Sequence, residues 1–214
     1  MQVLIVGSHG QIGQRIVRQL ASSDHRSRAM VRDADQEAQM KKLGAAETVV
    51  ADLEGDLSHA VDGCDAVVFV AGSGGGTGPE KTDAIDRDGA ISMVDAARKA
   101  GVKRFVMLSS MGADAPEQGP DDLQHYLKAK QAADRHLIGS GLEYTIVRPG
   151  ALNDDGGTQR IEAATVLQRS GEIPRDDVAA VLIQVLAAPN TIGTHFEVLS
   201  GGSSLQEAVA SIHA

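Results

Sequence analysis

The sequence predicts an α/β fold in which a doubly wound, mostly parallel sheet carries helices on both faces. Three observations support this prediction. Short apolar runs alternate with helical patterns along the whole chain. The run at residues 66–70 is apolar throughout, as expected of a strand that is covered on both faces. A glycine-rich turn joins the first apolar run to the first helical pattern.

The elements follow one another in a regular order. The first apolar run, residues 3–6, leads through the glycine turn into a helical pattern with apolar residues at 12, 16, 17 and 20. Further strands are expected at residues 29–31, 48–50, 66–70, 104–108, 144–147 and 195–199. Further helices are expected at residues 36–43, 81–99, 123–138 and 177–187, and a capping box at Ser204 and Glu207 predicts a short terminal helix.

Length and composition limit the class of protein. The 214 residues are enough for a sizeable core, so we expect a single domain over residues 1–214. A net charge of −9 without a basic cluster argues against a nucleic-acid partner. The single cysteine, Cys64, excludes an internal disulfide, fits a reducing cytoplasm and is expected to be a small packing residue. We expect neither a signal peptide nor a membrane partner, because the first apolar run lacks a basic leader and no run approaches the length of a bilayer span.

The turn after the first strand carries the pattern Gly7-x-x-Gly10-x-x-Gly13. Gly7 allows a sharp exit from the strand in a backbone conformation that a β-carbon would disfavour. Gly10 leaves room for the backbone to approach a pyrophosphate, and Gly13 allows the helix to pack closely against the sheet. The N-terminus of the helix offers unpaired N–H groups and a favourable dipole to an anion. The same glycines would suit a purely structural turn, but the strand–turn–helix context favours a dinucleotide phosphate site.

The residue at the end of the second strand distinguishes between dinucleotides. An acidic residue there would bind a ribose 2′-hydroxyl and favour NAD, whereas this chain has Arg32 followed by Asp33. A guanidinium suits a 2′-phosphate, so the sequence favours NADP, and Asp33 leaves NAD open. Alternatively, Arg32 is a solvated surface residue that pairs with Asp33 or Asp35.

Ligands of doubly wound sheets lie across the carboxyl ends of the strands, so residues directly after strands are of interest. Asp52 follows the third strand, where its carboxylate could accept a hydrogen bond from an adenine amino group. The glycine-rich run at residues 71–78 follows the fourth strand, and its lack of side chains allows the backbone to approach a cofactor. The alternative for this run is a mobile surface loop.

Ser109 and Ser110 follow the fifth strand, and Tyr126 and Lys130 lie four residues apart on one face of the next helix. A phenol with an ordinary pKa of about 10 is a poor base at neutral pH, but a neighbouring ammonium and a cationic nicotinamide favour its phenolate. A serine hydroxyl would orient a substrate carbonyl, so the group indicates proton transfer coupled to hydride transfer. Tyr and Lys at this spacing also occur by chance on ordinary helices.

Together these motifs resemble the short-chain dehydrogenase/reductase superfamily, in its atypical single-domain branch of epimerase/dehydratase-like, NmrA-like and biliverdin reductase B-like proteins. The resemblance covers nearly the whole chain and rests on the glycine turn, Asp52-Leu53, residues 105–110, Tyr126-x-x-x-Lys130 and residues 144–150. It implies an NAD(P)-binding Rossmann fold. It also implies Ser110, ahead of Ser109, with Tyr126 and Lys130 as catalytic residues, and it matches Lys130 rather than Lys128 to the lysine of the family.

The resemblance and the motifs together give one set of expected cofactor-binding residues. By resemblance, Pro149 and Gly150 lie beside the nicotinamide. The full set is Gly7, Ser8, His9, Gly10, Gln11, Ile12, Gly13, Arg32, Asp52, Leu53, Ala71, Gly72, Ser73, Lys130, Pro149 and Gly150.

Two departures from the family limit what the resemblance implies. Sugar-nucleotide epimerases carry a sizeable substrate domain near the C-terminus, whereas here any cover over the substrate must come from residues 151–174. Some members of the branch also lack the tyrosine and bind NADP(H) as sensors. The pair Tyr126 and Lys130 favours an enzyme.

Other chemistry has little support in the sequence. His9 could touch a phosphate or remain solvated, and His125 could face the active site. No histidine, cysteine or carboxylate spacing predicts a metal site, and no nucleophile elbow predicts a hydrolase. The sequence therefore predicts an NADP(H)-dependent oxidoreductase that acts on a small carbonyl or quinone-like substrate, as a monomer or homodimer. The alternatives are a non-catalytic NADP(H)-binding regulator and an isomerase that oxidises its substrate transiently.

Overall fold

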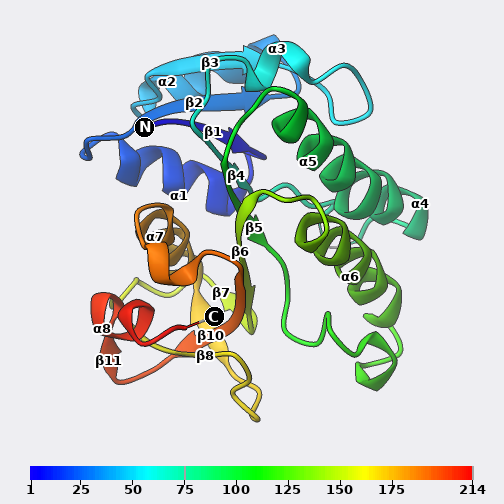
Figure 1. Ribbon diagram of the computed structural model, residues 1–214, viewed down its shortest axis with the longest axis vertical. Helices are drawn as coiled ribbons and strands as arrows, with labels where there is room; N and C mark the ends of the chain where they lie inside the picture. The colour runs from blue at the N-terminus through cyan, green and yellow to red at the C-terminus, as the bar shows by residue number, and fades with distance from the viewer. Residues whose placement is uncertain (75, 214) are drawn as a thin grey trace.

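The computed structural model describes residues 1–74 and 76–213, which fold around a nine-stranded sheet (Figure 1). The order of the strands is β11-β8-β10-β6-β5-β4-β1-β2-β3. The parallel strands are β1 (Gln2–Val6), β2 (Arg26–Val31), β3 (Glu47–Val50), β4 (Ala66–Phe69), β5 (Arg104–Leu108), β6 (Glu143–Pro149) and β10 (Thr194–Ser200). The antiparallel strands are β8 (Arg160–Ala164) and β11 (Ser203–Ser204). A separate parallel pair consists of β7 (Ala151–Asn153) and β9 (Glu172–Pro174).

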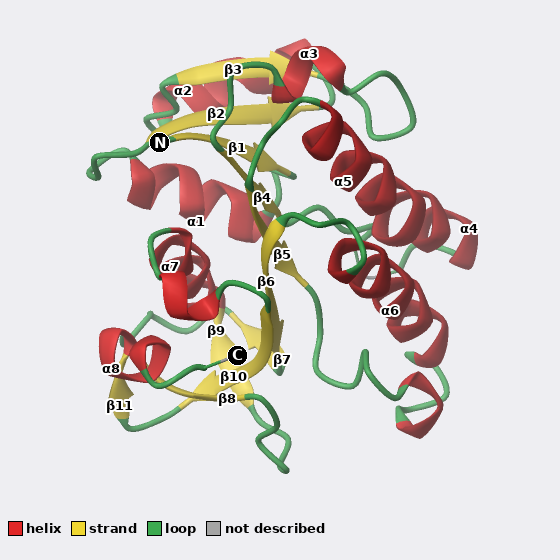
Figure 2. Ribbon diagram, in the orientation of Figure 1, coloured by secondary structure: helices red, strands yellow, loops and turns green. Residues whose placement is uncertain are grey.

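Helices cover both faces of the sheet (Figure 2). One face carries α1 (Gln11–Leu20), α2 (Glu37–Lys42), α7 (Arg175–Leu186) and α8 (Leu205–Ala210). The other face carries α3 (Ser58–Val61), α5 (Ala90–Lys99) and α6 (Gln124–Ile138). The short helix α4 (Pro79–Thr82) runs into a π-helical segment, η2 (Asp83–Gly89), which continues into α5. Single 3-10 turns occur at η1 (Ala34–Gln36), η3 (Pro116–Gln118) and η4 (Pro189–Thr191).

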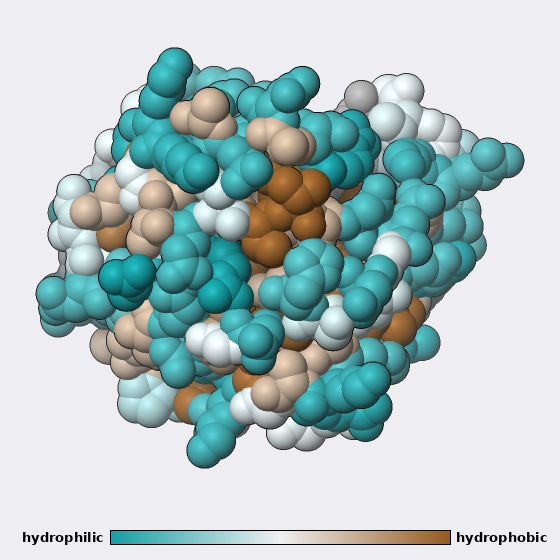
Figure 3. Space-filling view, turned by 90° about the horizontal axis from the view of Figure 1, so that it is seen from above, coloured by the Kyte–Doolittle hydropathy of each residue, from teal (hydrophilic) through white to brown (hydrophobic). Residues whose placement is uncertain are grey.

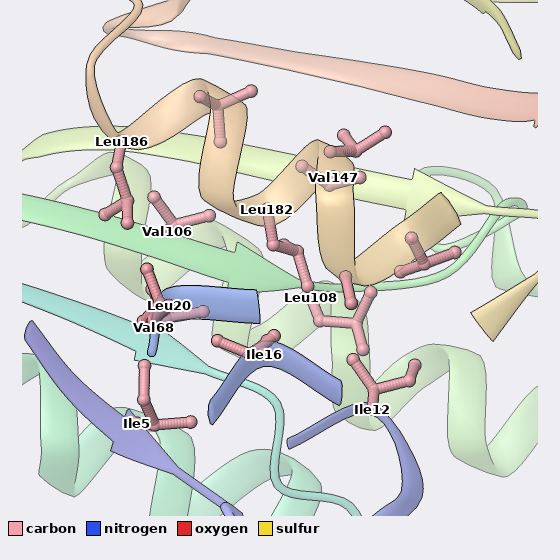
Figure 4. Packing of buried hydrophobic residues seen from close by; sticks show 14 of the residues in the cluster. Ile5, Ile12, Ile16, Leu20, Val68, Val106, Leu108, Val147, Leu182 and Leu186 are labelled. Atoms are coloured by element: carbon pink, nitrogen blue, oxygen red, sulfur yellow. The ribbon is translucent and has the colours of Figure 1, made fainter. Parts of the chain in front are cut away.

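The core consists of two aliphatic layers that lie on either side of the sheet. In β1, Val3 and Ile5 belong to one layer, whereas Leu4 and Val6 belong to the other. This alternation explains why the buried strands are apolar throughout, since both faces of each strand are covered. In the first layer, α1 and α7 lie side by side against the sheet (Figure 4).

The sequence predicted the architecture and most elements correctly. The doubly wound, mostly parallel sheet is confirmed, as is the capping box of α8, in which Ser204 and Glu207 exchange hydrogen bonds. The expected single helix over residues 81–99 is wrong in detail, because it begins at Pro79 and contains the π-helical segment η2. A π-helix bonds five residues apart, and the apolar periodicity used for the prediction does not report that change.

The segment 151–174, expected only as a cover over the substrate, contains three strands. Of these, β8 joins the main sheet beside β10, where Ile161 is fully buried. The short elements α3, β7, β8, β9 and β11 were all absent from the sequence prediction. Strands of this length carry little periodicity, and their partners lie far away along the chain.

The chain order reverses at β1, which lies between β2 and β4. Crevices at such reversal points are the usual ligand sites of doubly wound sheets, and here the turns that follow β1 and β4 meet. The face that is seen from the β3 end is mostly hydrophilic, with a small hydrophobic patch near its centre (Figure 3). Val50, at the end of the edge strand β3, is 40% exposed.

Candidate functional site

The turn after β1 requires glycine at two of its three glycine positions. Gly7 has a φ of +87°, and a β-carbon there would lie 2.6 Å from the Cα of Ala71. A β-carbon on Gly13 would overlap the carbonyl oxygen of Gly7 and lie 2.6 Å from the Cα of Ser8. The sharp exit at Gly7 was predicted correctly. The close neighbour of Gly13 is the turn itself rather than the sheet.

The start of α1 is suited to an anion. Gly10 is the N-cap residue, and within the described part of the chain no side chain caps the helix and no acidic residue occupies its first turn. The position of a β-carbon on Gly10 has one close neighbour, the Gly7 carbonyl oxygen at 3.2 Å, so the space outside the turn is open. Free N–H groups, a favourable dipole and open space together fit a phosphate group.

The other residues of the turn differ in whether their side chains or only their backbone groups are available to a ligand. The Ser8 hydroxyl is buried and donates a hydrogen bond to the carbonyl oxygen of Met30, 2.6 Å away. Ile12 packs in the aliphatic core, so Ser8 and Ile12 can meet a ligand only through their backbone. Gln11 is exposed, and the His9 ring lies 3.1 Å from the side-chain oxygen of Gln39.

A pocket of about 280 Å³ opens between the turns that follow β1, β2, β3 and β4. This volume is close to the lower end of the range of about 300–1,000 Å³ for ligand pockets, so it suits one half of a dinucleotide. The expected cofactor residues that line it are Gly7, His9, Gly10, Arg32, Asp52, Leu53, Ala71, Gly72 and Ser73. Residues that sequence reasoning missed also line it, namely Val6, Met30, Val31, Gln36, Ala51, Lys81 and Ile85.

The positively charged residues Arg32 and Lys81 line this pocket. The Arg32 side chain is 65% exposed and lies 3.5 Å from the carboxylate of Asp33, which is not among the residues that line the pocket in the described structure. Exposed ion pairs contribute little free energy, so Arg32 can turn toward an anionic ligand. Lys81 of α4 lies 2.9 Å from Glu54, a pairing that spans 27 positions in sequence and therefore leaves no local signal.

Asp52 lines the pocket, and its carboxylate shapes the turn after β3. Its Oδ1 accepts a hydrogen bond from the backbone N–H of Glu54 at 3.0 Å. The side chain of Leu53 is buried and packs against Gly89, where a β-carbon would lie 3.0 Å away. A local hydrogen bond and the packing of Leu53 thus hold the turn after β3 beside the pocket.

Ser110, Tyr126 and Lys130 lie outside the pocket, at the end of β5 and on α6. The Lys130 ammonium is buried, donates a hydrogen bond to the carbonyl oxygen of Leu108 at 3.3 Å, and lies 5.6 Å from the centre of the Tyr126 ring. Burial lowers the pKa of Lys130, but interactions with Tyr126 and Asp86 outweigh burial and raise the pKa above its ordinary value. Lys130 is therefore a charged group beside a phenol.

The two serines have different environments. The Ser109 hydroxyl is buried and donates to the Asp134 carboxylate at 2.9 Å, and the same carboxylate pairs with Arg148 at 3.0 Å. Burial raises the pKa of Asp134 against the opposing effect of Arg148. Ser110 is partly exposed and donates to the carbonyl oxygen of Met111 at 3.2 Å, a bond that a substrate carbonyl can replace. Ser110 is therefore the more accessible hydroxyl.

Three further expected residues lie near this group. The carbonyl oxygen of Pro149 accepts a hydrogen bond from Met111 at 3.0 Å, which joins the end of β6 to the serine loop. A β-carbon on Gly150 would overlap the carbonyl oxygen of Gly171, so packing accounts for this glycine. His125 lies on the surface, with its ring 2.9 Å from Asp83.

A residue that the sequence did not single out connects the pocket with the Lys130 group. Asp86, in η2, is fully buried and lies 3.0 Å from the Lys130 ammonium. Its other oxygen accepts a hydrogen bond from the backbone N–H of Ser73 at 2.9 Å. An aspartate in a helical pattern resembles any solvated surface residue, so the sequence alone gives no signal for this role.

Across residues 1–74 and 76–213, no three His, Cys, Asp or Glu side chains gather as a candidate metal site. None of the helices in these ranges has the length and apolar character needed to cross a bilayer.

Comparison with known proteins identifies the family. A family model described as NAD(P)H-binding matches residues 7–189. A Bacillus subtilis protein, described as the uncharacterized sugar epimerase YhfK, is 44% identical over 99% of this chain and 100% of its own length. A solved structure from Bacillus halodurans, provisionally assigned as an NAD-dependent epimerase/dehydratase, is 43% identical with a TM-score of 0.95 and covers 98% of both chains.

A second solved structure, the oxidoreductase ylbE from Lactococcus lactis, is 30% identical with a TM-score of 0.87 and covers 99% of this chain and 96% of its own. These relatives confirm the resemblance to epimerase/dehydratase-like proteins and the Rossmann-like fold. The match extends over the glycine turn, the pocket and the Lys130 group alike. The chain belongs to the NAD(P)H-binding family.

Proposed function

We propose that this protein is an NADPH-dependent oxidoreductase that reduces a small carbonyl or quinone-like substrate. The observation that carries the proposal is the buried Lys130 ammonium, which lies beside the Tyr126 ring. Burial of a charge costs free energy of desolvation, so a buried ammonium indicates a structural or functional role. An ammonium beside a phenol is the arrangement that proton transfer from a tyrosine requires.

The two halves of the site suit the two halves of a dinucleotide. We assign the pocket between the turns after β1 and β4 to the adenosine half, and the N-terminus of α1 to the pyrophosphate. The nicotinamide half then extends toward Lys130 on α6 and toward Pro149 and Gly150 at the end of β6. The segment 151–174, which follows directly, is assigned to the substrate side.

When bound, the nicotinamide supplies the hydride that is added to the substrate carbon. Tyr126 donates its phenolic proton to the substrate oxygen, so the carbonyl becomes a hydroxyl. Lys130 stabilises the phenolate that remains on Tyr126, and the phenolate regains a proton from solvent before the next turnover. Ser110 donates a hydrogen bond to the carbonyl oxygen and orients the substrate.

The preference for NADPH over NADH is assigned to Arg32. Among the described residues, Arg32 lines the pocket and Asp33 does not. We therefore assign the guanidinium, rather than the carboxylate, to the position of the ribose. Lys81 lines the same pocket and adds a second positive charge. Both charges favour a 2′-phosphate over a hydroxyl.

The test uses the two tyrosines of the chain as a matched pair. NADPH oxidation is measured with a panel of small aldehydes, ketones and quinones for wild type, Tyr126→Phe and Tyr144→Phe. Tyr126→Phe should lower kcat by about 10²–10⁴-fold, the usual contribution of a general acid, while NADPH binding is kept. Tyr144 lies on β6 opposite Phe105, so Tyr144→Phe should behave as wild type. Equal turnover in wild type and Tyr126→Phe would refute the role of Tyr126.

The names of the relatives support a second candidate, an epimerase or dehydratase-like isomerase. Such an enzyme would return the hydride to its substrate, so it would retain its cofactor tightly and show no net oxidation of NADPH. Binding of NADPH without turnover of any carbonyl, quinone or sugar nucleotide would instead favour the non-catalytic regulator. The same purified protein therefore distinguishes all three functions.

A further inference from the structure

Asp86 is a charged residue that is removed completely from solvent. A buried carboxylate requires partners that replace its lost hydration. Its two oxygens have different partners: Oδ2 accepts the backbone N–H of Ser73 at 2.9 Å, and Oδ1 lies 3.0 Å from Nζ of Lys130. A single side chain therefore contacts two separate parts of the site.

One partner belongs to the pocket and the other to the proton-transfer group. Ser73 lies in the loop after β4 and lines the pocket. Lys130 lies on α6 beside Tyr126. Asp86 reaches both because η2, which lies between α4 and α5, packs against α6 (Figure 1). The neighbouring Gly72 also lies close to Asp86, since a β-carbon there would be 3.2 Å from Oδ1 of Asp86.

The partners of Lys130 define where its ammonium sits. An ammonium has three N–H donors. The ammonium donates a hydrogen bond to the carbonyl oxygen of Leu108 at the end of β5, and it forms an ion pair with Oδ1 of Asp86, 3.0 Å away. The centre of the Tyr126 ring lies 5.6 Å from the same ammonium. Without Asp86, the ammonium would lose the carboxylate that lies 3.0 Å away, and it could rotate away from the tyrosine.

The π-helical form of η2 is part of this arrangement. Successive residues of a regular α-helix are separated by about 100° around the helix axis, so one extra residue in a turn changes which side chain faces a neighbour. Wider turns of this kind are frequent at functional sites. In η2 the wider turn includes Asp86, so the backbone irregularity coincides with the residue that contacts both Ser73 and Lys130.

We propose that Asp86 is a positioning residue that couples the pocket loop at Ser73 to the ammonium of Lys130. This inference rests on the proposed function for its catalytic consequence, but the coupling itself is a property of the protein without cofactor. The charged and titratable groups that face Lys130 are Asp86 from η2 and Tyr126 and Asp134 from α6. Asp86 is the only one of these three that also bonds the pocket loop.

The first experiment follows the lysine ammonium group by 15N NMR in the cofactor-free protein. Lys130→Arg identifies the Lys130 signal by its loss. Asp86→Asn keeps the shape of the side chain and removes its charge. Burial then acts on Lys130 with less opposition, so its pKa should fall from its raised wild-type position, and the backbone amide signal of Ser73 should shift.

Asp83→Asn is the matched control, because Asp83 lies in the same segment and pairs with Arg87 and His125 instead of Lys130. This variant should leave the titration of Lys130 and the amide of Ser73 unchanged. If Asp86→Asn leaves both signals at their wild-type positions, or if Asp83→Asn moves them equally, the coupling is refuted.

The second experiment adds NADPH to the wild-type protein and so does not depend on the folding of a variant. The amide of Ser73 and the ammonium of Lys130 should shift together, and a shift at Ser73 without one at Lys130 overturns the coupling. Asp86→Asn should weaken NADPH binding by about tenfold, the effect of one hydrogen bond to a charged group. When turnover of a carbonyl substrate is measured, the same variant should also shift the pH profile of kcat. A merely structural role would lower Tm and leave that profile in place. Absence of turnover in wild type would refute the proposed function. The NMR titration of the variants and the NADPH-induced shifts in wild type would still decide whether Asp86 couples Ser73 to Lys130.

Discussion

The backbones of Gly7 and Ala71 lie so close together that a β-carbon on Gly7 would be 2.6 Å from both Cα and N of Ala71. The two residues lie in the turns that follow the neighbouring parallel strands β1 and β4, and these turns meet at the reversal point of the sheet. The turn that faces the phosphate site and the loop that leads to Ser73 are thus in direct contact. A change at Gly7 must therefore displace the loop after β4.

Gly7→Ala tests this contact. The substitution adds backbone strain of about 1–3 kcal/mol for a side chain at positive φ, and it forces the Ala71 backbone away. We expect a lower free energy of unfolding in urea together with loss of NADPH binding, measured by fluorescence. Gly63→Ala is the control, because Gly63 also has positive φ, +69°, and has no neighbour within 4 Å of a β-carbon. If both variants bind NADPH equally, the contact with Ala71 has no bearing on the site.

Arg32→Ala tests the assignment of the 2′-phosphate. Loss of a charge-assisted hydrogen bond should raise the Kd for NADPH by about tenfold or more and leave the Kd for NADH unchanged. Arg26→Ala is the control, since Arg26 begins β2, the strand that Arg32 follows, and pairs with Glu47, away from the pocket. Titration of protein into each nucleotide, followed by fluorescence, gives both constants. Equal weakening of NADH and NADPH would show that Arg32 does not read the 2′-phosphate.

Cys64 provides a reporter of unfolding. Its thiol is buried, and burial raises the pKa of Cys64 above its ordinary value against the opposing effect of Arg28. A protonated, buried thiol reacts slowly, so we expect the aromatic disulfide reagent DTNB to label the native protein slowly at pH 8 and the protein in urea rapidly. Reaction at the same rate in both states would contradict the packing role.

The same thiol makes stability depend on pH in the alkaline range. The folded protein retains the Cys64 proton at pH values where the unfolded chain has lost it. The folded state then binds more protons, so the free energy of unfolding contributed by this group is present below the ordinary thiol pKa. It is lost as the pH rises through the higher pKa of the folded state. Cys64→Ser, compared with wild type in urea between pH 7 and about 10, isolates this contribution.

The capping box of α8 is a further testable feature. The Ser204 hydroxyl accepts a hydrogen bond from the backbone N–H of Glu207 at 3.3 Å, and the Glu207 carboxylate accepts from the backbone N–H of Ser204 at 3.1 Å. Ser204→Ala should lower the free energy of unfolding by about 1 kcal/mol, the usual value of an N-cap. Ser203→Ala, one residue earlier in β11, should have little effect. Equal losses in the two variants would contradict a specific cap.

The capping box also makes the free energy of unfolding depend on pH in the acid range. Hydrogen bonds from the side chain and backbone of Ser204 lower the pKa of Glu207. The stabilisation is therefore present above the ordinary glutamate pKa and is lost as the pH falls through the lower pKa of the folded state. NMR titration of the Glu207 carboxyl carbon should give a midpoint below that of an unstructured glutamate, and Ser204→Ala should return it toward the ordinary value.

Comparison of the two halves of the site shows where sequence reasoning succeeded. The residues of the pocket come from short motifs, such as Gly7 after β1 and Asp52 after β3, which the alternation of strands and helices aligns at one edge. The proximity of Tyr126 and Lys130 likewise follows from helical spacing. The missed residues Lys81 and Asp86 lie on the segments α4 and η2, and each gains its role from a partner that is distant in sequence.

The sequence by itself determined the alternation of elements, the glycine turn and the helical pair Tyr126 and Lys130, because each is encoded within a few neighbouring residues. Apolar periodicity is a local property, and it sufficed for a doubly wound sheet. The tertiary structure alone decided that β8 joins the sheet, that Lys81 reaches the pocket, and that Asp86 pairs with Lys130 across 44 positions of the chain. These outcomes depend on which surfaces pack together in the folded chain. A buried carboxylate such as that of Asp86 is stable only when a cation or hydrogen-bond donors replace its hydration.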